Sequence, residues 1–234
     1  MIAGVLCAVL TAGCENRIDG GPVPQRALSL PQVLPSAEQV AQAVGNRLDA
    51  TGPPLVGGIA LLPNGFRDAE DVSPLDCLGA ATPLMRVVYE KGGVRQVALQ
   101  DFSRYGEGLT VSSAHTGVVE FGSEAEASRM FESFAAQWRS CADTRVSVHV
   151  TPRSSLDWTI TDVRESDGIL STTVLNGESD RDPAFPTEHA VGQVANYLID
   201  VDVAVTDGDP NRRVASGRAA DLVRKIRGNI NRAR

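Results

Sequence analysis

The segment GSEAEASRMFESFAAQWRSCAD, residues 122–143, carries the clearest structural pattern in the chain. Its apolar residues recur at spacings of three and four, which is typical of a helix with one broad apolar stripe. Ser123 and Glu126 match a capping box at the start of this helix. The negative charge of Glu124 interacts favourably with the positive end of the helix dipole. The stripe consists of Ala127, Met130, Phe131, Phe134, Trp138 and Cys141. The sequence therefore predicts a long amphipathic helix that covers a hydrophobic core.

Strand patterns flank this helix on both sides. They are rich in β-branched residues, and most of them alternate apolar and polar side chains with the two-residue period of a strand. The segments 157–163 and 168–175 enclose the turn sequence RESDG, which predicts a β-hairpin. The acidic stretch 176–186 contains two prolines, and we expect it to be a loop. The other predicted strands are 94–102, 109–121, 145–150 and 196–209.

The predicted strand at 196–209 has a one-sided pattern. Its branched apolar residues alternate with Asp200 and Asp202, so the two kinds of side chain face opposite ways. This alternation indicates a strand with one face on a core and the other in water, which is usual in antiparallel sheets. The apolar positions are Ile199, Val201, Val203 and Val205.

Two further helices are predicted near the ends of the folded part. In the first, Ser36 and Gln39 match a capping box, and Gly45 or Asn46 ends the helix. The second lies within 217–230, where apolar residues again recur at helical spacing. Hairpin spacing with helices at intervals predicts an α+β fold, a single domain with an antiparallel sheet and helices packed on one face. A chain of 234 residues suits one such domain.

Composition excludes two classes of protein. The formal net charge is −7, whereas nucleic-acid binding needs clustered Lys and Arg, so we expect no nucleic-acid partner. No stretch of 18 or more apolar residues occurs, which argues against a membrane-spanning helix.

The N-terminus has the pattern of a secretory signal. Residues 2–12 are nearly all apolar or small, a length that fits a signal h-region. The sequence Leu-Thr-Ala-Gly-Cys at 10–14 resembles a bacterial lipobox, although Thr11 stands where Leu or Val is usual and no basic residue precedes the run. We expect a signal peptide at 1–13, lipidation of Cys14, a flexible tether at 14–32 and a domain at 33–234. The alternative is a buried N-terminal helix with a core cysteine.

Two cysteines remain if Cys7 leaves with the signal and Cys14 is acylated. Export permits a disulfide between Cys77 and Cys141. Closing a loop of 64 residues (141 − 77) would add about 4 kcal/mol of stability in the chain-entropy model. The alternative is two separate buried thiols. Neither cysteine has a second Cys or a His at ligand spacing, so no metal site is predicted there.

Several segments together resemble the PknH-like extracellular domain, the external sensor part of a mycobacterial Ser/Thr protein kinase that also occurs alone in secreted lipoproteins. The resemblance covers 29–234 and implies an antiparallel sheet with helices and a ligand-binding cleft. It also implies that Cys77 and Cys141 match the first disulfide of that family, whereas the second has no counterpart here. Kinase motifs are absent, so phosphotransfer is not implied. The segments are LPSAEQVAQAVG, DCLG, VVYE, FGSEAEASRMFESFAAQWRSCAD and ASGRAADLVRKI.

Candidate chemical groups are sparse. The three histidines, His115, His149 and His189, lie in or beside predicted strands and match no motif, so we expect ordinary strand residues. Asp157 and Asp162 are the type of acid pair that a hydrolase would need.

A calcium loop is hinted at by oxygen-bearing side chains at alternate positions. The pattern fails because an EF-hand needs a glycine at its sixth position and a glutamate at its twelfth, where Arg181 and Thr187 stand. We therefore expect a solvated acidic turn, with no metal and no cofactor. The oxygen-bearing residues are Asn176, Glu178, Asp180 and Asp182.

The functional hypothesis is a lipid-anchored protein at the extracytoplasmic face of the cell membrane. Its domain is expected to bind a small molecule or an envelope protein, without catalysis. The alternatives are a secreted hydrolase that uses carboxylates and an envelope lipid carrier. A hydrolase requires a pocket with two acids, and a carrier requires an apolar cavity of several hundred Å³ or more.

Overall fold

The computed structural model describes residues 28–151, 154–178, 181–206 and 217–234. The predicted signal peptide, the lipidation residue Cys14 and the tether as far as residue 27 lie outside these ranges. None of the described helices is long and apolar enough to cross a membrane.

The described part contains helices and strands in the following order. They are α1 (Leu30–Val33), α2 (Ala37–Val44), β1 (Asp49–Ala50), β2 (Leu55–Gly57), β3 (Val72–Ser73), α3 (Leu78–Ala81), α4 (Arg86–Tyr89), β4 (Val94–Ser103), β5 (Val111–Phe121), α5 (Glu124–Ser140), β6 (Arg145–Thr151), β7 (Ser154–Ser166), β8 (Ile169–Glu178), β9 (Arg181–Val194), β10 (Tyr197–Val205) and α6 (Arg218–Ala233), with short 3-10 turns at Ile59–Leu61 and Leu75–Cys77.

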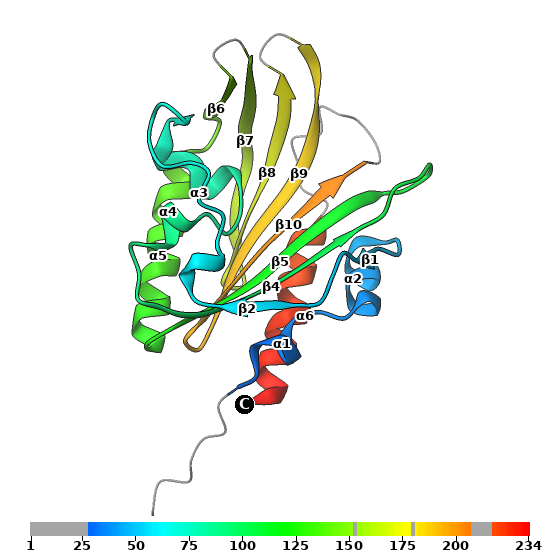
Figure 1. The fold of residues 1–234 in the computed structure, drawn as a ribbon, viewed down its shortest axis with the longest axis vertical. Helices are drawn as coiled ribbons and strands as arrows, with labels where there is room; N and C mark the ends of the chain where they lie inside the picture. Colours follow the sequence, from blue (N-terminus) through cyan, green and yellow to red (C-terminus); the bar gives the residue numbers. More distant parts are fainter. Residues whose placement is uncertain (1–27, 152–153, 179–180, 207–216) are drawn as a thin grey trace, which may run out of the picture.

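One antiparallel sheet organises the molecule (Figure 1). Its strand order is β1-β4-β5-β10-β9-β8-β7-β6-β3, and β2 also pairs with β4. Strands β6 to β10 form a meander of successive neighbours, and α5 connects β5 to the far side of that meander. The meander therefore returns to pair β10 with β5, so that strands far apart in sequence lie side by side.

Local sequence signals account for the helix ends. The Ser36 hydroxyl accepts a hydrogen bond from the backbone N–H of Gln39, and the Gln39 side-chain oxygen accepts one from the backbone N–H of Ser36, which confirms the predicted capping box. Gly45 ends α2 in the left-handed conformation that glycine adopts without steric cost. At α5 only half of the predicted box forms, because Ser123 accepts from the Glu126 amide and the reciprocal bond is not made.

The predicted β7–β8 hairpin is confirmed, with longer strands than expected. Ser166 pairs with Ile169, so the loop is only Asp167 and Gly168. Both residues have positive φ values, 54° and 64°, as a type I′ turn requires.

The expected loop at 176–186 is wrong: β8 continues to Glu178 and β9 begins at Arg181. The low strand propensity of Asp and Pro explains the error. Residues 181–186 pair with β8, whereas the pairing of β9 with β10 begins only at Thr187. Proline is tolerated on such a singly paired stretch because no second neighbour needs its missing amide hydrogen.

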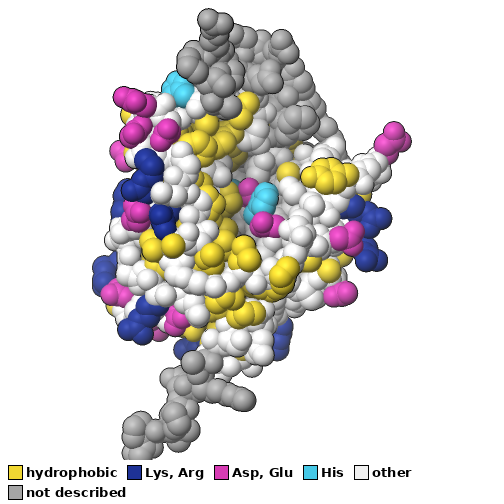
Figure 2. All heavy atoms as spheres, viewed as in Figure 1, with side chains coloured by type: hydrophobic (Ala, Val, Ile, Leu, Met, Phe, Trp, Pro, Cys, Tyr) yellow, Lys and Arg dark blue, Asp and Glu magenta, His cyan; other side chains and the backbone are white. Residues whose placement is uncertain are grey.

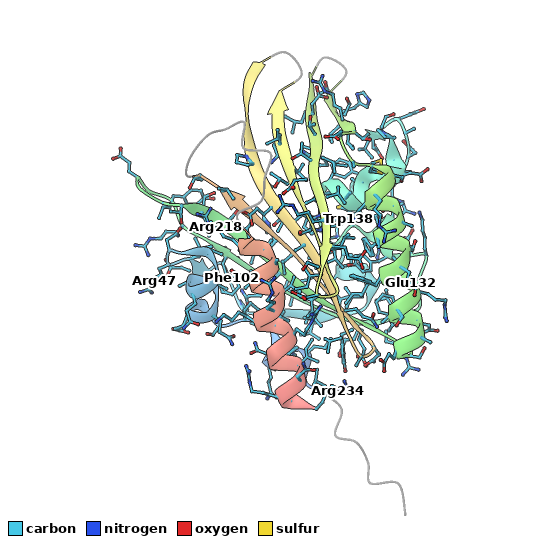
Figure 3. The ribbon with its side chains drawn as sticks, turned by 180° about the vertical axis from the view of Figure 1, so that it is seen from behind. Arg47, Phe102, Glu132, Trp138, Arg218 and Arg234 are labelled. Atoms are coloured by element: carbon cyan, nitrogen blue, oxygen red, sulfur yellow. A yellow bond between two sulfur atoms is a disulfide. The ribbon has the colours of Figure 1, made fainter. Side chains whose placement is uncertain are left out.

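The expected α+β class and single antiparallel sheet are confirmed, but helices cover both faces instead of one. On one face α3, α4 and α5 enclose a first core, which includes Trp138 and Leu198. On the other face α1, α2 and α6 enclose a second core, which includes Phe102 and Ile199 (Figure 3). Neighbouring residues of one strand thus enter different cores, because each apolar helix stripe needs a sheet face of its own.

Helix α6 packs unusually close to the sheet. A side chain at Gly192 of β9 would place its Cβ 2.4 Å from a methyl group of Val223, so only glycine fits there. The carboxylate of Glu188, also on β9, accepts a hydrogen bond from the Ala219 amide at the start of α6. This end of the helix has unpaired amide groups, so the buried acid fixes where α6 begins.

Candidate functional site: a hollow above a buried aspartate cluster

The disulfide fixes one side of the site. Cys77 ends a short 3-10 turn and Cys141 directly follows α5, and the two are joined with Cα atoms 5.6 Å apart. The predicted pair is therefore present, and both cysteines are buried. The bridge ties the segment that carries α3 to the end of the longest helix.

Asp200 of β10 holds the loop that joins α3 to α4. Its Oδ2 accepts hydrogen bonds from the Leu84 amide at 2.9 Å and from the Tyr89 hydroxyl at 2.7 Å. Leu84 has a φ of +59°, an uncommon conformation for a leucine, and it lies against Gly117 of β5. A Cβ at Gly117 would stand 2.4 Å from the Leu84 side chain, so the glycine makes this approach possible.

His189 of β9 completes the buried cluster. Its Nε2 is 2.7 Å from Asp200 Oδ1, and its Nδ1 is 3.3 Å from the carbonyl oxygen of Ala80 in α3. Both ring nitrogens therefore face oxygen acceptors. The Trp138 ring lies over it with centroids 4.5 Å apart. Burial, and then the Asp200 charge, raise the pKa of Tyr89 well above its usual range, so the phenol stays a donor.

The burial of Asp200 corrects the prediction that both aspartates of β10 face water. Asp200 is 1% exposed because α3, α4 and their connecting loop cover this part of the sheet. Asp202, two residues further on, has a side chain that is 15% exposed. The sheet face therefore passes from a closed core to an open surface along one strand.

A hollow opens in this face beyond the covered part. Asp202 lies opposite His115 of β5, and His115 lies opposite Asp101 of β4. The Nδ1 of His115 is 2.6 Å from Asp202 Oδ1, and the His115 side chain is 48% exposed. Figure 2 shows a histidine beside acidic side chains on one side of the hollow, with hydrophobic side chains facing it from the other.

Apolar side chains of β7 lie on the same face of the sheet as the first core. Trp158 of β7 contacts Phe66 edge-to-face, with ring centroids 5.8 Å apart. Both rings pack against the first core while remaining partly exposed. Leu156, two residues before Trp158, is 38% exposed. The hollow thus combines one charged side with one apolar side.

Asp202 controls the charge of His115. The hydrogen bond to Asp202 raises the pKa of His115 to about 9, partial burial opposes this rise, and the charges of Asp202 and Asp101 add to it.

We expect an NMR titration of His115 to show a midpoint near pH 9, and the Asp202→Asn variant to titrate closer to 6.5. Because the folded pKa is above the unfolded one, the stabilisation is complete below about pH 6.5 and is lost as the pH rises towards 9. A wild-type midpoint near 6.5 would contradict the pairing.

The other candidate residues lie elsewhere. His149 is an exposed residue of β6, at the far edge of the sheet from His115. Asp157 pairs with Arg145 at 3.3 Å, whereas Asp162 pairs with Arg164 at 2.6 Å, so each of the two acids has its own basic partner.

The predicted acidic turn falls at the β8–β9 connection. Asn176 donates a hydrogen bond to the Thr187 hydroxyl at 2.7 Å and so links β8 to β9, while Asp180 lies outside the described residues. Among the described residues, no three His, Cys, Asp or Glu side chains are grouped in a way that would hold a metal.

Comparison with known proteins places this geometry in a family. A family model for the PknH-like extracellular domain matches residues 26–228. The crystal structure of the extracellular domain of PknH from Mycobacterium tuberculosis is similar, with a TM-score of 0.71 and 20% identity over 87% of this chain and 95% of that one. The X-ray structure of the Rv0999 ortholog from Mycobacterium smegmatis has a TM-score of 0.43 and 13% sequence identity, and the match covers 87% of this chain and 96% of that one. No curated protein sequence matches the chain.

The family match covers the first core, all of the second core except Ile230, the disulfide and the strands that carry the hollow. The solved PknH domain shares the fold. The resemblance expected from the sequence is therefore confirmed, and the chain belongs to the PknH-like extracellular domain family.

Proposed function

We propose that this protein is a lipid-anchored, extracytoplasmic binding protein that recognises a ligand in the hollow without catalysing a reaction. Membership of a family of extracellular, sensor-type domains supports recognition outside the cytoplasm. The observation that carries the proposal is the His115–Asp202 pair, in which the His115 side chain is 48% exposed, together with the hollow in Figure 2 that has hydrophobic side chains on its other side.

The free polar atoms of the hollow supply the recognition. Within the described residues, His115 Nε2 and the Asp101 carboxylate have no hydrogen-bond partner, so they offer one donor and one acceptor to a ligand. Trp158 and Leu156 offer apolar contact area on the other side. Small-molecule sites generally combine apolar contacts with a few polar groups that fix orientation, and the hollow has both.

The proposed anchor is an acylated Cys14. The lipobox-like sequence supports it, since the apolar run ends in small residues directly before this cysteine. Each buried acyl methylene contributes about 0.8 kcal/mol, so two or three chains hold a protein firmly at a bilayer. The described chain enters the fold at Leu30, which is 1% exposed and packs beside α6.

Fractionation of cells tests the anchor. We expect the Cys14→Ala variant to leave the membrane fraction, because no thiol remains to carry the acyl chains. Cys7→Ala is the matched control, since it removes a thiol from the same apolar run while leaving the acylation residue, and it should stay with membranes. Retention of Cys14→Ala in the membrane fraction would refute the anchor.

Native mass spectrometry of protein purified from its own envelope tests recognition in the hollow. The wild type and the His149→Gln variant should retain the same bound mass, and His115→Gln should lose it, because only His115 faces the hollow. Equal retention by both histidine variants would place the ligand elsewhere. A retained mass that corresponds to a membrane lipid would favour the lipid carrier instead.

A further inference from the structure

Helix α6 carries a concentration of positive charge in an acidic protein. The last ten residues of α6 and the following Arg234 contain five basic residues and no acid, although the chain has a net charge of −7. Burial of Arg227, and then the nearby charge of Arg224, lower the pKa of Arg227, and the charge of Asp167 opposes this. The basic residues are Arg224, Lys225, Arg227, Arg232 and Arg234.

Most of this charge is not neutralised. Among the described residues only Arg224 has a carboxylate partner, Asp221. Lys225 donates to the Gln42 amide oxygen, and Arg232 donates to the Asn229 amide oxygen, and neither acceptor is charged. Arg227 is directed at the carbonyl oxygens of the β7–β8 turn, so it is not available at the surface. Arg232 and Arg234 therefore remain exposed and positively charged at the end of the helix.

The same end of α6 lies where the chain enters the fold. The Asn229 side chain donates to the carbonyl oxygens of Val33 and Leu34 at the end of α1, while its Oδ1 accepts from Arg232. Figure 3 labels Arg234 at one end of the molecule, and Figure 1 shows α1 beside this end of α6 and the strand ends where β6 meets β7 and β8 meets β9 at the opposite end. The basic end is thus the end nearest the proposed anchor.

Chain length limits how far this end can be from the membrane. Residues 15–27 separate Cys14 from the first described residue, Leu28. Even a fully extended chain of this length reaches only about 50 Å. Attraction between a basic group and an anionic surface acts within about 8 Å at physiological salt, and an anchor of this reach allows the arginines to enter this range.

We propose that Arg232 and Arg234 dock the C-terminal end of α6 onto anionic lipid headgroups. The docking orients the domain, because it places the basic end on the membrane and directs the far hairpins away from it. This inference rests on the proposed anchor at Cys14, which decides which end faces the bilayer. Each arginine near an anionic surface strengthens binding about fivefold, so the pair contributes about 30-fold and orients the anchored protein.

Vesicle binding by unacylated protein tests the docking. The protein is residues 14–234 with Cys14→Ser, which contains every described element, and the vesicles are phosphatidylcholine with or without 30% phosphatidylglycerol. We expect binding to the anionic vesicles only, weakened when NaCl is raised from 50 to 500 mM. Arg232→Gln with Arg234→Gln should lower the partition coefficient about 30-fold, and the two Arg→Lys substitutions should preserve it.

Arg139→Gln with Arg145→Gln is the matched control, since it removes the same charge from α5 and β6, away from the basic end. This control should bind as the wild type does. Equal binding to neutral and anionic vesicles, or undiminished binding by the Arg232 and Arg234 glutamine variant, would overturn the docking. No acyl chain takes part in vesicle binding. A negative result in this experiment would therefore refute the docking alone, whereas the anchor is tested separately by fractionation of the Cys14→Ala variant.

Discussion

Replacing Asp200 with alanine is expected to lower the free energy of unfolding by about 3–5 kcal/mol. The substitution removes the carboxylate that lies within hydrogen-bonding distance of three buried groups, on Leu84, Tyr89 and His189. Buried donors without partners carry their full desolvation cost. Urea unfolding followed by tryptophan fluorescence measures the loss, since the Trp138 ring contacts His189 of the cluster.

Asp202→Ala is the matched control for this prediction. Asp202 lies on the same strand and also pairs with a histidine, but His115 is half exposed, so the loss should stay below about 1 kcal/mol. Asp200→Asn serves if the alanine variant does not fold, because it keeps an acceptor oxygen and should cost less. Asp200 variants as stable as the wild type would show that the buried cluster does not hold the α3–α4 loop.

Removing the disulfide is expected to cost about 4 kcal/mol. The bridge closes a loop with a sequence separation of 64 residues, and its loss frees the unfolded chain. The Cys77→Ser, Cys141→Ser double variant should therefore unfold at a lower urea concentration than the oxidised wild type. Dithiothreitol should bring the wild type to the same midpoint and leave the double variant unchanged. A wild type that is indifferent to reductant would contradict the bridge.

The losses in the free energy of unfolding caused by the Asp200 substitution and by removal of the disulfide should not simply add. The disulfide holds the segment that begins α3, and Ala80 of α3 provides the carbonyl oxygen that faces His189. Asp200 holds the other end of the same segment through Leu84 and Tyr89. Once one attachment is gone, the segment is freer to move and the second attachment holds less, as is usual for groups in one network.

Local patterns in the sequence predicted the elements that depend on local physics. The helical spacing of 122–143 gave α5, and the Asp167–Gly168 turn gave the β7–β8 hairpin. The capping pair at Ser36 and Gln39 gave the start of α2. Each signal lies within a few residues of the structure that it specifies, so no knowledge of the tertiary fold is needed.

The candidate site depends on contacts between distant residues, which the sequence does not reveal. Asp200 reaches partners 11, 111 and 116 residues away, so its alternation with apolar residues looked like a solvent-facing pattern. The pairing of His115 with Asp202 spans 87 residues and follows from the register of β5 with β10. Before that register is known, His115 cannot be told apart from His149 or His189.

The first residue of the native chain can be read directly by intact-mass and N-terminal peptide mass spectrometry of protein extracted from its own membranes. We expect the chain to begin at Cys14 with diacylglycerol attached through its sulfur, and to lack residues 1–13. A native chain that still begins with Met1 and carries no acyl mass would contradict the anchored, extracytoplasmic protein proposed here.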